Sequence, residues 1–220
     1  EIDTEHETEE IALANSGKKL IFQFPHLILG AVAIFLHLGT QVISIDSIIS
    51  YAGSMNISML EAKVFPSYTL FTMIIGYVLG IILIPKFISQ VRVLQVCTLL
   101  GVIFTLIIIY GKIEVNFLGH DTNLSIWFVV LLGLPNSLVW AGIWPLALDG
   151  LGRFTKLGSS ILIMGLAGNA IMPLIYGHYA DTAGLRNAYW ILMPCYLFLV
   201  YYAFYGYTIR RWSPFKIERK

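Results

Sequence analysis

The first evidence for the fold is the run at residues 24–51, which reads FPHLILGAVAIFLHLGTQVISIDSIISY. Asp46 is the only acidic residue in this run, and the run contains no Lys or Arg. A helix rises about 1.5 Å per residue, so about 20 apolar residues cross the hydrocarbon core of a bilayer. The run is long and apolar enough to predict a transmembrane helix.

The whole chain has the composition of a membrane protein. Of its 220 residues, 57% are hydrophobic and 12% are charged, and the mean hydropathy is +0.77. A soluble domain has about 45–50% apolar and about 25% charged residues. This composition excludes a disordered chain, a fibrous repeat and a nucleic-acid-binding protein. We expect the lipid bilayer, and no nucleic acid, among its partners.

Six apolar runs are separated by turn and breaker residues such as Pro85-Lys86 and Asp149-Gly150. Membrane strands are not expected, because the runs are continuously apolar rather than alternating. The pattern predicts an all-α integral membrane protein with six transmembrane helices. They are expected at 24–51, 66–84, 93–110, 126–148, 159–179 and 188–209.

The basic residues predict the orientation. With a cytoplasmic N-terminus, eleven Lys and Arg fall in cytoplasmic segments and three, Lys63, Lys112 and Arg186, fall outside. Cytoplasmic segments are the ones enriched in Lys and Arg. We therefore expect a multi-pass protein of the cell (inner) membrane with both termini cytoplasmic. The expected domains are an acidic cytoplasmic linker at 1–22, a six-helix domain at 23–209 and a basic cytoplasmic tail at 210–220.

The N-terminal residues are acidic, and the chain has only two cysteines. Six of the thirteen acids lie in the first ten residues, and the first Met is Met55. We expect a solvated linker there and a chain that is a fragment, a processed product or a truncated form. Cys97 and Cys195 lie inside apolar runs and are expected to be free thiols.

Polar side chains in a membrane span need a reason, because they are costly in hydrocarbon. Successive helical residues turn by about 100°, which places His37, Gln41, Ser44 and Tyr51 on one stripe of the first span. Two hypotheses remain open for this stripe: it lines a polar cavity, or it makes hydrogen bonds between helices. Asp46 lies on the opposite face near the outer interface. We favour a structural or gating ion pair for Asp46 over a proton carrier.

The fourth span carries Asn136, Trp140 and Trp144 on neighbouring helical positions. An amide offers two donors and an acceptor, and an indole offers a flat apolar face. Together they suit a sugar ring with its hydroxyl rim. In the fifth span, which is rich in small residues, Asn169 is either a ligand contact or a structural hydrogen-bonding group.

The sequence holds no constellation that predicts catalysis. We find no Ser/His/Asp set, no zinc-protease motif and no P-loop, and Asp46 has no second acid to pair with. We expect no enzyme activity, no catalytic residue, no metal site and no cofactor.

The text of the chain resembles the fucose and glucose/galactose permeases, which are sugar–proton symporters of the major facilitator superfamily. LDGLGRFTKLGSS at 148–160, followed by IMG at 163–165, resembles the connection between their tenth and eleventh helices. LGTQ at 38–41 with DSIISY at 46–51 is similar to the seventh helix, and GYVLG at 76–80 is similar to the eighth. NSLVWAGIWP at 136–145 is similar to the tenth. The resemblance covers about residues 18–209.

The resemblance implies the C-terminal half, helices 7–12, of a transporter with twelve helices, whose N-terminal six-helix half is a partner. It also implies that the carboxylates that take up the proton lie mainly in that other half. We expect a hexose sugar (glucose-, galactose- or fucose-like) to be moved with protons by alternating access. The alternatives are a non-transporting sensor or assembly subunit, and a facilitator-type transporter of another small molecule. The candidate substrate-binding residues are Gln41, Asn136, Trp140, Asn169, His37 and Trp144.

Overall fold

The computed structural model describes residues 20–84 and 86–212. The expected linker at 1–22 and tail at 210–220 therefore lie mostly outside the described residues. Long helices dominate the described part of the chain, and a short hairpin is its only sheet. In chain order the elements are η1 (Ile21–Gln23), α2 (Pro25–Gly53), α3 (Met59–Ala62), α4 (Phe65–Leu83), α5 (Gln90–Tyr110), β1 (Glu114–Phe117), β2 (His120–Asn123), α6 (Leu124–Leu131), α7 (Gly133–Leu148), η2 (Gly152–Phe154), α8 (Thr155–Met164), η3 (Gly165–Ala167), α9 (Gly168–Ala183), α10 (Leu185–Ala188), η4 (Tyr189–Ile191), α11 (Leu192–Phe204) and η5 (Gly206–Thr208).

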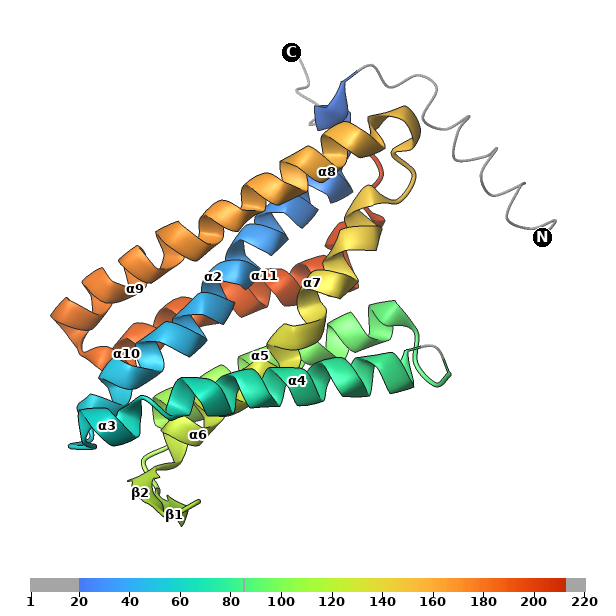
Figure 1. The fold of residues 1–220 in the computed structure, drawn as a ribbon. Coiled ribbons are helices and arrows are strands. Elements are labelled where there is room, and N and C mark those ends of the chain that lie inside the picture. The colour runs from blue at the N-terminus through green and yellow to red at the C-terminus, as the bar shows by residue number, and fades with distance from the viewer. Residues whose placement is uncertain (1–19, 85, 213–220) are drawn as a thin grey trace.

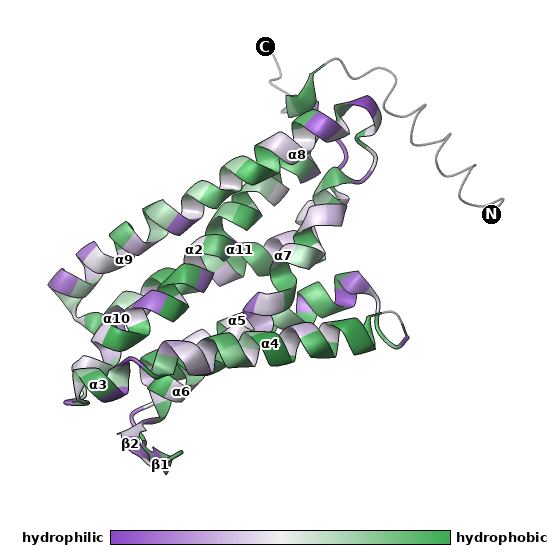
Figure 2. Cartoon of the chain, in the orientation of Figure 1, coloured by the Kyte–Doolittle hydropathy of each residue, from purple (hydrophilic) through white to green (hydrophobic). Residues whose placement is uncertain are grey.

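These elements form six helical segments that are long and apolar enough to cross a membrane, so the all-α, six-span prediction is confirmed. Apolar residues dominate the long helices, whereas hydrophilic residues gather at the helix ends and the hairpin (Figure 2). The six segments are Pro25–Gly53, Met59–Leu83, Gln90–Tyr110, Leu124–Leu148, Gly152–Ala183 and Leu185–Phe204.

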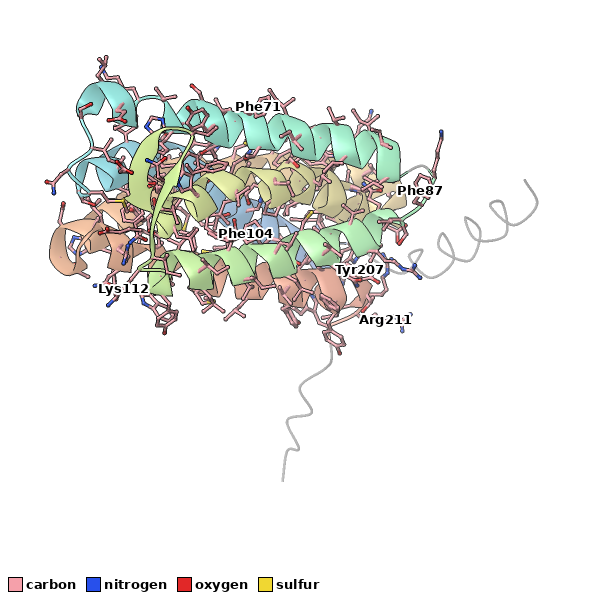
Figure 3. The ribbon with its side chains drawn as sticks, turned by 90° about the horizontal axis from the view of Figure 1, so that it is seen from below. Phe71, Phe87, Phe104, Lys112, Tyr207 and Arg211 are labelled. Carbon is pink, nitrogen blue, oxygen red and sulfur yellow. The ribbon has the colours of Figure 1, made fainter. Side chains whose placement is uncertain are left out.

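Helix α7 crosses the middle of the bundle and packs against α2, α4 and α5 (Figure 1). Helix α2 also packs against α9 and α11, and α11 packs against α5. Many outward side chains are apolar: Phe71 points away from the bundle on α4 and is 60% exposed (Figure 3). A chain whose apolar side chains cover its outer surface requires lipid or another protein around it.

Small residues let α9 lie directly against α2. A Cβ added at Gly168 would collide with the backbone carbonyl of Phe35, and a Cβ at Gly39 would collide with Met172. The small-residue pattern of the fifth span therefore serves close helix packing, as in other membrane bundles.

Four of the six membrane-crossing segments are interrupted, and a proline follows each interruption. Pro66, Pro135 and Pro194 lie in the first turn of α4, α7 and α11, and Pro173 lies in the second turn of α9. A proline has no N–H and its ring crowds the carbonyl four residues earlier, so it is tolerated near a helix start. The prolines thus favour the breaks after α3, α6, α8 and η4, where the chain restarts its helix.

The hairpin of β1 and β2 adds two short strands to the expected all-α fold. The two strands pair antiparallel, with Glu114 opposite Asn123 and Phe117 opposite His120. They lie in a connection at one end of the bundle, outside the six spans. Lys112 marks this end, and Phe87 and Arg211 lie at the other end (Figure 3).

The two ends of the described chain are joined to each other. The Trp212 indole donates to the Phe22 carbonyl at 2.7 Å. Near them, Arg210 forms an ion pair with Asp149, at the end of α7. These contacts fasten the first, fourth and sixth spans at the end opposite the hairpin. The free state expected for Cys97 and Cys195 is confirmed, and both thiols are buried.

Candidate functional site

A pocket of about 240 Å³ opens among α2, α4, α7 and η3. It brings together four of the six residues that the sequence singled out for substrate binding, from two spans far apart in the chain. The lining residues are His37, Leu38, Gln41, Tyr77, Asn136, Trp140 and Leu166. We call this the central pocket.

His37 lines the pocket from α2 with its side chain fully buried. Neither ring nitrogen has a hydrogen-bond partner among the described residues. A neutral imidazole carries one donor and one acceptor. Because a buried polar group without a partner is costly, these two nitrogens are available to a ligand that offers a hydroxyl group.

Asn136 lines the pocket from α7 and is 1% exposed. Its Oδ1 accepts a hydrogen bond from the Tyr196 hydroxyl at 2.8 Å, which fixes the amide orientation. Its Nδ2 has no partner within the described part of the chain. The amide therefore presents donors to the pocket and keeps its oxygen for α11.

Gln41 lies one turn beyond His37 on the same helix. Its Nε2 lies 3.8 Å from the Met73 sulfur, which is a weak acceptor. A substrate hydroxyl would be a stronger partner. Ser44, which belongs to the same polar stripe of α2, differs from His37 and Gln41. Its hydroxyl donates to the Gln41 carbonyl of its own helix at 2.7 Å, so it needs no ligand.

Trp140 and Trp144 stack on each other, with ring centroids 5.2 Å apart and planes 27° apart. Trp140 lines the central pocket, and Trp144 is not among its lining residues. Trp144 therefore meets the central pocket only through its contact with the Trp140 ring. The arrangement presents one flat aromatic face next to hydrogen-bonding side chains, which suits a sugar ring.

Asn169 and Asp46 lie away from the pocket lining. Asn169 Oδ1 is buried with no partner among the described residues. Asp46 is exposed, and it takes part in neither of the ion pairs of the described chain. The ion pair expected for Asp46 is thus not formed within residues 20–84 and 86–212, and the roles of both residues stay predictions.

Sequence reasoning missed several residues that shape this pocket. Tyr77 reaches it from α4 and Leu166 from η3, and Tyr196 holds the Asn136 amide from α11. Tyr77 follows Gly76, and a Cβ at Gly76 would collide with Ser137. The Gly76 and Gly80 pattern was a signal that α4 approaches α7 closely, and therefore that Tyr77 lies near Asn136.

Over the described residues, no group of three or more His, Cys, Asp or Glu side chains is placed to hold a metal ion. His37 and Gln41 line the same pocket as the Asn136 amide and the Trp140 indole. The arrangement can bind an uncharged, hydroxyl-rich molecule through hydrogen bonds and one stacked ring.

Comparison with solved structures identifies the fold. It is the fold of half of FucP, a protein described as a major facilitator superfamily transporter. It matches the Escherichia coli fucose:proton symporter FucP with a TM-score of 0.72 and 23% identity, covering 81% of this chain and 42% of that one. FucP in the outward conformation gives a TM-score of 0.71, with 21% identity, 81% coverage of this chain and 41% of that one.

The curated relatives are glucose/galactose transporters, so the sequence resemblance to this branch is confirmed. The Brucella abortus glucose/galactose transporter is 30% identical over 200 residues, which are 90% of this chain and 46% of that protein. The Helicobacter pylori putative glucose/galactose transporter is 25% identical over 197 residues, 86% of this chain and 46% of the relative. The chain spans about half the length of the curated relatives it matches. No protein-family model matches the sequence.

Proposed function

We propose that this chain is the C-terminal six-helix half of a secondary transporter that moves a hexose together with protons by alternating access. The central pocket carries the proposal, because it gathers His37, Gln41, Asn136 and Trp140 around one space. The named activities of the relatives, glucose/galactose transport and fucose:proton symport, agree with it. The chain would act as a transporter and not as an enzyme.

The roles of the pocket residues follow from their chemistry. Asn136 would donate to a sugar hydroxyl, His37 and Gln41 would each bond further hydroxyls, and Trp140 would stack on the ring. Trp144 would hold Trp140 in place. Asn169 would be a contact reached in another stage of the transport cycle, because its oxygen is buried without a partner among the described residues.

A second six-helix half would complete the transporter. The central pocket of about 240 Å³ is open rather than enclosed, so a second half could cover it. Transporters of this fold place the substrate at the interface of two repeats near the bilayer midplane. The protein would lie in the cell (inner) membrane with both termini cytoplasmic, so the hairpin end would face outward. The proton-binding carboxylates would lie mainly in the other half.

Hexose uptake by the intact transporter tests the proposal. Asn136→Ala and Trp140→Ala should each reduce uptake of radiolabelled D-glucose or D-galactose at least about tenfold, because each removes a direct ligand contact. Trp190→Phe is the matched control, since Trp190 is 41% exposed and lies outside the pocket. Near wild-type uptake in both pocket variants would refute the site.

Reconstitution in liposomes tests the transport activity itself. Addition of D-galactose should drive proton entry into liposomes that contain the intact protein. A sensor or assembly subunit would bind sugar and move no protons. Uptake without proton movement would indicate a facilitator instead.

A further inference from the structure

A second and larger pocket, of about 640 Å³, lies at the hairpin end of the bundle. It is bounded by the turn after α2, by both hairpin strands and by the first turn of α10. Its lining residues are Met55, Asn56, Glu114, Val115, Asn116, Asp121, Thr122, Asn123 and Arg186. We call it the hairpin pocket.

The strand register gives one face of the hairpin a purely polar surface. Glu114 pairs with Asn123, and Asn116 pairs with Asp121. Because alternate strand residues point to the same face, these two carboxylates and two amides share one side of the hairpin. All four line the hairpin pocket.

The opposite face, whose Val115 and Thr122 also border the pocket, fastens the hairpin to the bundle. The buried Trp127 indole donates to Thr122 at 2.8 Å, and its ring lies 4.8 Å from that of Phe117. His120 pairs with Glu61 of α3 at 2.7 Å. The polar face is therefore held in a fixed position by contacts made on the other side of the two strands.

A guanidinium group completes the pocket wall. Arg186 Nε donates to the Tyr51 hydroxyl at 2.9 Å, and its Nη2 donates to Ser125 at 3.2 Å. These bonds hold the side chain across α2, α6 and α10 and leave Nη1 for a ligand. The side chain is thus a positioned donor beside the acceptors of the hairpin.

This mixture of groups selects the chemistry of a ligand. Carboxylates accept from hydroxyls, the guanidinium donates, and the amides do both. An anion is disfavoured because Glu114 and Asp121 outnumber the single guanidinium. A metal ion is disfavoured because Arg186 shares the wall and no metal-binding group of three exists in the described chain. Asn116 Nδ2 already donates to Asp121 Oδ1 at 2.6 Å, and Asn123 Oδ1 already accepts from Ser125 Oγ at 2.9 Å. The Glu114 carboxylate, the second oxygen of Asp121 and Arg186 Nη1 remain for a ligand, and a neutral, hydroxyl-rich molecule matches them.

We propose that the hairpin pocket is an outer binding site for a hexose, from which the sugar passes to the central pocket. The passage of sugar from the hairpin pocket to the central pocket rests on the proposed transport function. The hairpin pocket is bounded by the turn after α2, and α2 itself lines the central pocket. Tyr51 of α2, which holds Arg186, lies about 15 Å along the helix from Gln41. No aromatic ring lines the hairpin pocket, so its binding is weaker than that of the central pocket.

The experiment measures sugar binding when the central pocket is disabled. Saturation-transfer NMR is recorded with D-galactose and the intact transporter carrying Asn136→Ala and Trp140→Ala. A galactose signal should remain in this variant, and adding Glu114→Ala with Asp121→Ala should remove it. Asp181→Ala is the matched control, because it removes an exposed acid outside the pocket and should keep the signal.

Three outcomes overturn the inference. The first is the absence of any signal when the central pocket is disabled, and the second is a signal that survives loss of Glu114 and Asp121. The third is a signal abolished by EDTA, which would indicate a divalent cation site. Hexose uptake by the wild-type protein is measured in parallel. If uptake is absent while the galactose signal is retained, the transport function is refuted. If uptake is normal while the galactose signal is absent, only the outer site is refuted.

Discussion

The Gln90 side-chain amide donates a hydrogen bond of 2.6 Å to the backbone carbonyl of Ala141. Ala141 lies four residues before Pro145, inside α7, and proline has no N–H with which to bond that carbonyl. The first residue of α5 therefore supplies the donor that α7 lacks. In a bilayer this matters more than in water, because lipid offers no replacement donor.

Replacing Gln90 by Leu should lower the free energy of unfolding by about 0.5–1.5 kcal/mol, the usual range for hydrogen bonds between membrane helices. Pro145→Ala restores an N–H for the carbonyl, so Gln90→Leu should cost much less in that background. Thermal unfolding of the four proteins in detergent gives the double-mutant cycle. An equal cost in both backgrounds would show that the two residues are not coupled.

Gly168→Ala should destabilise the bundle, because the new methyl group would meet the Phe35 carbonyl. We expect a loss of about 1–3 kcal/mol, as for other overpacked sites. Gly177→Ala on the same helix is the control, since nothing lies within 4 Å of a Cβ there. Comparable melting temperatures for the two variants would contradict the close contact of α2 and α9.

Tyr196→Phe should raise the KM for hexose uptake about threefold to tenfold, the effect of one net hydrogen bond, and leave the maximal rate nearly unchanged. The variant frees Asn136 from the bond that orients its amide. Tyr202→Phe is the control on the same helix, because that buried hydroxyl has no partner among the described residues. If Tyr202→Phe shifts the KM equally, the effect does not pass through Asn136.

Thr122→Val should destabilise the hairpin by about 1–3 kcal/mol, the cost of leaving the buried Trp127 N–H without an acceptor. The substitution keeps the size of the side chain. Hydrogen exchange of residues 114–123 should therefore speed up. Thr182→Val, at an exposed position whose hydroxyl bonds only its own helix, should leave that exchange unchanged.

Much of the membrane domain was predictable from the sequence, because continuous apolar runs and breakers mark spans directly. The stripe on the first span was predictable in part. His37 and Gln41 reach the central pocket, whereas Tyr51, ten residues further along the helix, joins Ser125 and Arg186 at the hairpin end instead. A helical wheel reports the direction of a side chain but not its depth in the membrane.

The hairpin was not predictable by the usual turn signal. Its turn residues Leu118 and Gly119 both have positive φ, at 51° and 82°. Asn or Asp normally precedes Gly in such two-residue turns, and Leu rarely adopts this conformation. The contacts of Thr122, His120 and Phe117 with the bundle hold the turn in place, and those contacts exist only in the folded chain.

The cross-helix bonds near the prolines have a mechanical consequence. Gln90 of α5 donates a hydrogen bond to the Ala141 carbonyl of α7. Thr72 of α4 donates to the Val130 carbonyl of α6 at 2.7 Å, two residues before the break at Leu132. The fourth span thus has a joint, and each side of the joint accepts a side-chain hydrogen bond from a different neighbouring helix. If this span bends during a transport cycle, these hydrogen bonds couple its motion to the second and third spans. The three helices then move together.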